Sequence, residues 1–106
     1  MISKKNILLG IPEKLSEEYF EEIISSNQFK LERIVSEGHK SPKDFWYDQE
    51  KDEFVMLISG SAEIQFENEP AVQMVKGDYL IIPAHKKHRV EKTDLIQQTI
   101  WLALHF

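Results

Sequence analysis

The chain has 106 residues, of which 42% are hydrophobic, and a formal net charge of −5 at pH 7. A chain of this length forms one domain around one core. It contains no cysteine, which excludes disulfides, thiolate metal sites and a cysteine nucleophile. The acidic balance argues against nucleic acid as a partner, because phosphates attract basic surfaces. No apolar run is long enough for a signal-peptide core or a membrane span, so we expect a cytoplasmic protein without a membrane partner.

An amphipathic helix is predicted near the start of the chain. Apolar side chains recur there at three- and four-residue steps among glutamates, at Leu15, Tyr19, Phe20, Ile23 and Ile24. Pro12 suits a first helical turn, and Ser16 can cap it. We therefore expect residues 1–27 to form a helical N-terminal extension and residues 28–106 to form the main domain.

Seven short apolar runs follow from Phe29 onward, separated by turn residues. The runs are FKLERIVS, EFVMLISG, SAEIQFE, AVQMV, YLIIP, HRVEK and TIWLALHF. Apolar and polar residues alternate in them, most clearly at Ala62, Ile64 and Phe66, as on a strand with one buried face. Seven short strands with no helix between them predict an all-β antiparallel sandwich or barrel.

Two stretches place a polar side chain at a fixed distance from a glycine. In GDYLIIPAHKKHRV, Gly77 lies six residues before Pro83, and His88 follows five residues after that proline. In EFVMLISG, Glu53 stands seven residues before Gly60. Each stretch therefore combines a turn, a strand and a side chain that is able to bind a metal ion.

These two stretches resemble the two sequence motifs of the cupin superfamily. The second motif, G-x5-P-x-G-x2-H-x3-N, is matched at Gly77, Pro83 and His88. The first motif, G-x5-H-x-H-x3,4-E-x6-G, is matched at its end by Glu53 and Gly60. The region from Phe29 onward is similar to small single-domain bacterial cupins. The resemblance implies a double-stranded antiparallel jelly-roll barrel that encloses a pocket, and it brings no assigned reaction.

The first motif lacks both of its histidines in this chain. In the shorter spacing these positions fall on Tyr47 and Gln49. In the longer spacing they fall on Trp46 and Asp48, and the sequence leaves both registers open. His85 occupies the glycine position of the second motif. A site of three histidines and one glutamate therefore cannot form.

The resemblance still implies a reduced metal site. Its expected ligands are Gln49, Glu53, His85 and His88, and its expected pocket residues are Tyr47 and Asp48. Mixed oxygen and imidazole ligation suits a divalent ion such as iron, manganese, zinc or nickel. His85 has two interpretations: it is a fourth ligand, or it is a turn residue that faces water, since histidine tolerates the positive φ that usually selects glycine.

Three further polar residues receive structural interpretations. His39 lies in a turn region between Gly38 and Ser41, and His105 stands in the apolar closing strand. We interpret both as structural histidines. Arg89 follows His88 directly, so it should point to the opposite face of the strand.

Two functions from different classes agree with these observations. The first is a metal-dependent enzyme that acts on a small organic molecule, as an oxygenase, an isomerase or a lyase. The second is a metal-free module that binds or senses a small ligand without catalysis. We also expect a homodimer, because the chain is small and its closing strand WLALHF is apolar enough to pair or pack between subunits.

Overall fold

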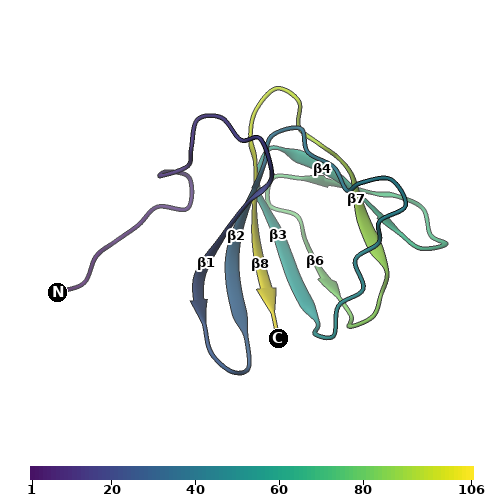
Figure 1. The fold of residues 1–106 in the computed structure, drawn as a ribbon, viewed down its shortest axis with the longest axis horizontal. Helices are drawn as coiled ribbons and strands as arrows, with labels where there is room; N and C mark the ends of the chain where they lie inside the picture. Colours follow the sequence, from purple (N-terminus) through teal and green to yellow (C-terminus); the bar gives the residue numbers. More distant parts are fainter.

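The computed structural model describes all 106 residues and consists of eight β-strands, with no helix. The strands are β1 (Tyr19–Ser25), β2 (Lys30–Ser36), β3 (Glu53–Ser59), β4 (Ser61–Phe66), β5 (Val72–Val75), β6 (Tyr79–Ile82), β7 (His88–Thr93) and β8 (Thr99–His105). They form a five-stranded sheet in the order β1-β2-β8-β3-β6 and a three-stranded sheet in the order β5-β4-β7, and all pairs are antiparallel (Figure 1). The all-β prediction is confirmed, and strands β2 to β8 coincide with the seven apolar runs.

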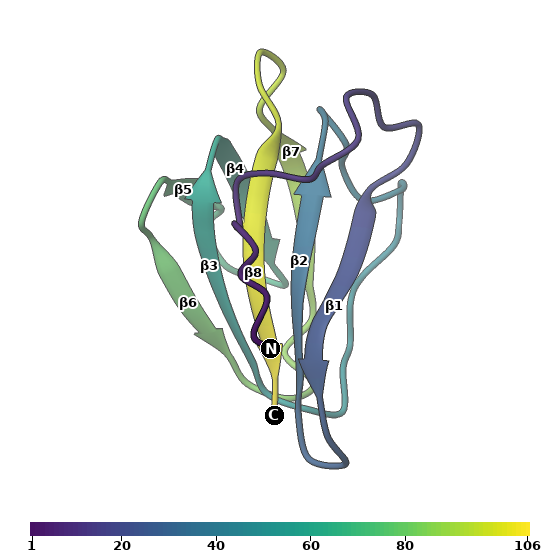
Figure 2. The same ribbon diagram turned by 90° about the vertical axis from the view of Figure 1, so that its left-hand side faces the viewer.

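The two sheets face each other and bury one core between them (Figure 2). Alternate residues of each strand point inward, so the core gathers Val55 and Leu57 from β3, Ile64 from β4, and Trp101 and Ala103 from β8. Leu57 and Ala103 are fully buried. The same inward-facing positions hold polar residues at one end of each strand, Glu53 at the start of β3 and His105 at the end of β8.

The predicted N-terminal helix is wrong, because its second half forms strand β1. Tyr19 to Ser25 pair with β2 in an antiparallel ladder, with a register shift between Glu22 and Ile24. The segment YFEEIIS is rich in aromatic and β-branched residues, which pack well on a pleated sheet. Cross-strand pairing with β2 therefore overrides the helix-like spacing of its apolar residues. The domain boundary expected at residue 28 remains a prediction, and it falls in the turn between β1 and β2.

Residues 1–18 form turns and extended chain without regular secondary structure. Part of this segment crosses the outer side of the five-stranded sheet near β8 and β2 (Figure 2). Arg33 of β2 holds it there, since its guanidinium donates hydrogen bonds to the carbonyl oxygens of Ile7, Leu9 and Gly10 at 3.1, 2.7 and 3.3 Å. The buried Arg33 also contacts Glu21 at 2.9 Å.

Strand β8 lies in the middle of the larger sheet. It pairs with β2 on one side and with β3 on the other. His105, for example, lies opposite Lys30 of β2 and opposite Glu53 of β3. Both edges of β8 are therefore occupied within the chain, and it cannot add to a sheet of another subunit. The exposed edges of the larger sheet are β1 and β6.

Candidate functional site

A cavity of about 80 Å³ lies between the two sheets, and eight of its fourteen lining residues are hydrophobic. Its lining residues are Glu18, Phe20, Glu32, Ile34, Tyr47, Gln49, Glu53, Val55, Ile64, Ile82, His88, Val90, Trp101 and His105. The cavity is smaller than the roughly 300–1,000 Å³ of pockets that enclose drug-sized ligands. It can therefore enclose only an ion, a few water molecules or one end of a small organic molecule.

His88 and Glu53 face each other across this cavity. Their residues are 6% and 7% exposed, and the distance from His88 Nε2 to Glu53 Oε1 is 3.7 Å. That distance is too long for a hydrogen bond. His88 Nδ1 lies 2.8 Å from the carbonyl oxygen of Lys86 and must donate to it, since a carbonyl only accepts. In the neutral ring the lone pair is then on Nε2, the nitrogen nearest Glu53.

Tyr47 and Gln49 reach the cavity from a segment that runs beside β7. The Tyr47 amide donates to the His88 carbonyl at 2.7 Å, and the His88 amide donates to the Tyr47 carbonyl at 3.1 Å. The two rings stack with centroids 5.5 Å apart. Because residues two apart on an extended segment face the same way, Gln49 joins Tyr47 at the cavity, whereas Trp46 and Asp48 are not part of its lining. Of the two registers left open by the sequence, the structure adopts the one with Tyr47 and Gln49 inside.

His85 and Asp48 lie together outside the cavity. His85 Nδ1 is 2.8 Å from Asp48 Oδ1, and the His85 side chain is 66% exposed. His85 has a φ of 64°, the left-handed conformation that the glycine of the motif would supply. Its amide donates to the carbonyl of Gln49 at 2.8 Å, so the turn also holds the segment that carries the cavity residues. The structure does not bring His85 or Asp48 together with Glu53 and His88.

Sequence reasoning missed a second polar pair in the cavity, Glu32 and His105. His105 Nε2 lies 3.0 Å from Glu32 Oε1, and Lys30 Nζ lies 3.6 Å from Glu32 Oε2. His105 is the register partner of Glu53 on the neighbouring strand, so both side chains face the cavity. The alternation of β8 could have indicated His105, because residues two apart on a strand face the same way and His105 follows the buried Trp101 and Ala103 at this spacing.

The cavity shifts the pKa of two of its groups. The hydrogen bond from His105 is the main cause that lowers the pKa of Glu32, helped by the charge of Lys30, against a burial effect that raises it. Burial is the main cause that raises the pKa of the Tyr47 phenol, and the charges of Glu18, Glu53 and Glu32 raise it further. Tyr47 is therefore a protonated hydrogen-bond donor at neutral pH, next to carboxylates that accept.

The charges and donor atoms of the lining fit a cation. Three glutamates and no lysine or arginine line the cavity. No group of three or more His, Asp or Glu side chains is close enough to hold a metal ion. The His88 imidazole and the Glu53 carboxylate are nevertheless close enough for one ion to reach both through bonds of roughly 2.0–2.2 Å. The donor set therefore fits a divalent ion held by two close side chains, and Gln49 offers a further oxygen on the lining.

The family description "Cupin domain" matches residues 32–102 of the sequence. The chain belongs to the cupin family. That match includes Glu53 and His88 and ends within β8. No curated protein matches the sequence of this cupin. No helix suited to crossing a membrane is present in it.

Solved structures resemble this cupin over nearly its whole length. A Ralstonia eutropha protein named as a candidate mannose-6-phosphate isomerase has 41% sequence identity and a TM-score of 0.94, with 98% of this chain and 97% of that chain covered. A cupin superfamily protein of Desulfitobacterium hafniense has 18% identity and a TM-score of 0.75, with 91% and 83% covered. The TT1209 protein of Thermus thermophilus has 12% identity and a TM-score of 0.79, with 98% and 96% covered. The last two show a shared fold alone.

Proposed function

We propose that this cupin binds a divalent metal ion, one of iron, manganese, zinc or nickel, at His88 and Glu53. Gln49 is the proposed third donor, through its amide oxygen. The observation that carries the proposal is the pair of buried donor atoms 3.7 Å apart, with the other nitrogen of His88 occupied by a carbonyl. Histidine ligands of metals usually donate their second ring nitrogen in this way, which orients the ring and raises its basicity.

We propose further that a small organic molecule with oxygen-bearing groups binds beside this ion. When bound, such an ion supplies Lewis-acid polarisation of a carbonyl or hydroxyl oxygen. The Tyr47 phenol donates a hydrogen bond to the ligand, and Glu32 accepts one while His105 holds its carboxylate in place. Ile34 and Val55 complete an apolar wall that limits the entry of water.

Isomerase or lyase chemistry is the proposed reaction class, ahead of oxygenase chemistry. The Glu32 carboxylate, which His105 holds, can take a proton from one atom of a ligand and return it at another. The name of the Ralstonia eutropha relative supports an isomerase. The phosphate of a sugar phosphate does not suit the enclosed part of the cavity, because that part is small and is lined by three glutamates without a lysine or arginine. We therefore propose an uncharged end of the ligand inside the cavity.

A metal-free binding module is the second candidate function. It is favoured by the absence of a third His, Asp or Glu close to His88 and Glu53. In that case the same Tyr47, Glu32 and His88 groups bind the ligand by hydrogen bonds alone. Metal content separates the two candidates.

Metal content after saturation with manganese or zinc and removal of loosely held ions tests the proposal. We expect a stoichiometric ion in the wild-type protein and loss of tight binding in His88→Ala and Glu53→Ala. Gln49→Ala should weaken binding less, because a neutral amide oxygen is a poorer donor than a carboxylate. His39→Ala is the matched control, since His39 is bonded to the Glu37 amide and does not line the cavity. Full metal content in both His88→Ala and Glu53→Ala would show that the proposed site is wrong.

A further inference from the structure

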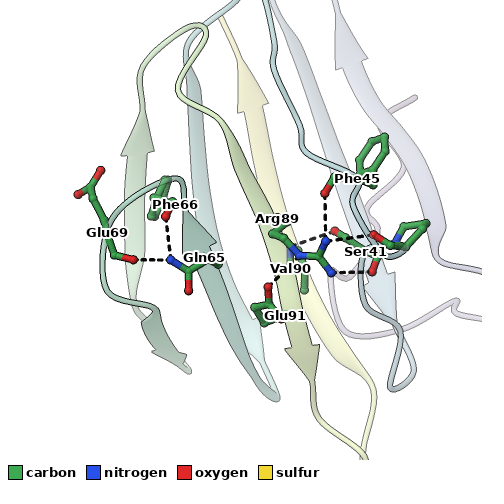
Figure 3. Close-up of polar contacts among 9 residues, drawn as sticks. Ser41, Phe45, Gln65, Phe66, Glu69, Arg89, Val90 and Glu91 are labelled. Carbon is green, nitrogen blue, oxygen red and sulfur yellow. Dashed lines mark hydrogen bonds and ion pairs between the residues drawn. The ribbon is translucent and has the colours of Figure 1, made fainter.

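Arg89, on the outer side of β7, contacts three backbone carbonyls, a carboxylate and an aromatic ring. Its guanidinium donates hydrogen bonds to three carbonyl oxygens of the segment between β2 and β3, those of Ser41, Pro42 and Phe45, at 3.2, 3.1 and 3.4 Å (Figure 3). Its Nε lies 2.8 Å from Glu91 Oε1, and the Arg89 side chain is 13% exposed. It also lies over the Trp46 ring at 6.0 Å, within cation–π range.

The segment that Arg89 holds is fixed by hydrogen bonds at separate points and not by a continuous strand ladder. Residues 37–52 contain no strand, and their only β pairing is the isolated bridge between Tyr47 and His88. Near Arg89, the Ser41 amide donates to the Val90 carbonyl, and the Val90 amide donates to the Ser41 hydroxyl. The three carbonyls that accept from Arg89 belong to residues two to six positions before Tyr47 in the chain. The guanidinium therefore fixes the entry into the stretch that carries Tyr47 and Gln49.

We infer that Arg89 is a positioning residue for the cavity, acting through residues 41–49. It does not line the cavity, and it acts on Tyr47 and Gln49 by fixing the backbone that carries them. The planar guanidinium spreads its donors over two terminal nitrogens in a fixed fork, so it reaches the three carbonyls while its charge pairs with Glu91, whereas lysine offers one flexible point charge. Its effect on metal affinity rests on the proposed function, whereas its effect on Tyr47 does not.

Arg33 offers a matched control for this inference. Its side chain is 5% exposed, somewhat less than that of Arg89, and it likewise donates to three carbonyls of an irregular segment and contacts a glutamate. The segment that it holds, Ile7 to Gly10, lies on the outer side of the larger sheet and contributes no cavity residue. Loss of either arginine removes a comparable set of contacts, but only Arg89 should affect the cavity.

The experiment compares Arg89→Gln, Arg89→Lys and Arg33→Gln in two measurements. In metal-free protein, NMR should show loss of the contacts between the Tyr47 and His88 rings and faster exchange of the Tyr47 and His88 amides in both Arg89 variants only. In zinc titrations, the Arg89 variants should bind about tenfold or more weakly, the range for groups that orient metal ligands. Arg89→Lys keeps the charge and provides a second test if Arg89→Gln does not fold.

The outcomes separate the two proposals. Wild-type ring contacts and amide exchange in Arg89→Lys would overturn the positioning role, whatever the metal result. Changes of the same size at Tyr47 in Arg33→Gln would also overturn it, because the effect would then be general destabilisation. A wild-type protein that binds no zinc, with Tyr47 displaced only in the Arg89 variants, would overturn the metal site and support the positioning role.

Discussion

His85 and His88 lie three residues apart but have very different surroundings. His88 is buried, donates to a backbone carbonyl and directs Nε2 toward Glu53. His85 stands in the turn with a positive φ and pairs with Asp48 at the surface. One imidazole therefore belongs to the cavity, whereas the other stabilises the turn that delivers it.

Replacing His85 by glycine tests this division. Glycine adopts the required positive φ without strain, so the turn should be preserved while the imidazole and its contact with Asp48 are lost. We expect unchanged zinc affinity by isothermal titration calorimetry and a change in unfolding free energy within about 1 kcal/mol, the typical net contribution of one hydrogen bond. A loss of affinity comparable to that of His88→Ala would make His85 a ligand.

Glu32 makes a pH-dependent contribution to the unfolding free energy of the protein. Its pKa is lowered in the folded protein, mainly by the hydrogen bond from His105, below its ordinary value of 4.5. The contribution is therefore fully present above pH 4.5 and is lost as the pH falls through the lower folded value. We expect Glu32→Gln to lower the unfolding free energy by roughly 1.5–3 kcal/mol near neutral pH, the range for hydrogen bonds to charged groups.

Urea unfolding of wild type and Glu32→Gln between pH 3 and pH 7 measures this contribution. The difference in unfolding free energy should shrink as the pH falls below 4.5. A difference that stays constant, or that grows on acidification, would show that the Glu32 carboxylate is not stabilised by His105.

At the scale of elements, the glycines at two turns differ in what surrounds them. Gly60 joins β3 to β4 with a φ of +84°, and an added Cβ would lie 2.7 Å from Thr99 Oγ1 and 2.8 Å from Thr99 Cα. Gly77 precedes β6 with a φ of +94°, and nothing lies within 4 Å of its added Cβ. The first glycine serves both conformation and close packing, and the second serves conformation alone.

Alanine substitutions should reveal this difference. Gly77→Ala should cost about 1–2 kcal/mol for the left-handed backbone. Gly60→Ala should cost roughly 3 kcal/mol or more, because overpacking against the backbone of β8 adds to the same strain. Chemical denaturation at 25 °C checks the ranking, and equal losses would contradict the close approach of Thr99.

The local sequence predicted strands β2 to β8, but it did not predict strand β1 or the full set of cavity residues. Turn residues and two-residue alternation identified β2 to β8. The prediction for the segment that begins at Tyr19 was wrong, because aromatic and branched residues at mixed spacing suit either a helix or a strand. Only pairing with β2 decides between these two structures. Glu53 and His88 were found because the cupin motifs fix their distance from a glycine. Glu32 and His105 were not found, since the contact between their side chains depends on the register between β2 and β8.

At the scale of the whole molecule, the larger sheet leaves an apolar edge uncovered. Strand β1 pairs only with β2, and Phe20, Ile23 and Ile24 on it are about half exposed. Exposed apolar edges invite pairing with another chain. The homodimer therefore remains our prediction, and its contact must be at an edge because β8 is enclosed within the sheet. We expect β1, which carries three exposed large apolar side chains, whereas the other edge, β6, carries two, Tyr79 and Ile81.

Sedimentation equilibrium at micromolar concentration checks the homodimer. We expect twice the chain mass for the wild type and a shift toward the monomer for Ile24→Lys, which places a charge in the contact. Ile81→Lys on the other edge, β6, is the matched control and should leave the mass unchanged. A wild-type monomer would remove the prediction, and an effect of Ile81→Lys alone would move the contact to β6.

The proposed function requires a metal site in the cavity between the two sheets, with His88 Nε2 as a ligand. Long-range ¹H–¹⁵N NMR of the histidine side chains during zinc titration tests this most directly. We predict a large shift of His88 Nε2 at one equivalent of zinc, with His88 Nδ1 still protonated and the signals of His39 and His85 unchanged. Zinc binding that leaves His88 Nε2 unshifted, or no zinc binding at all, would contradict the proposed function.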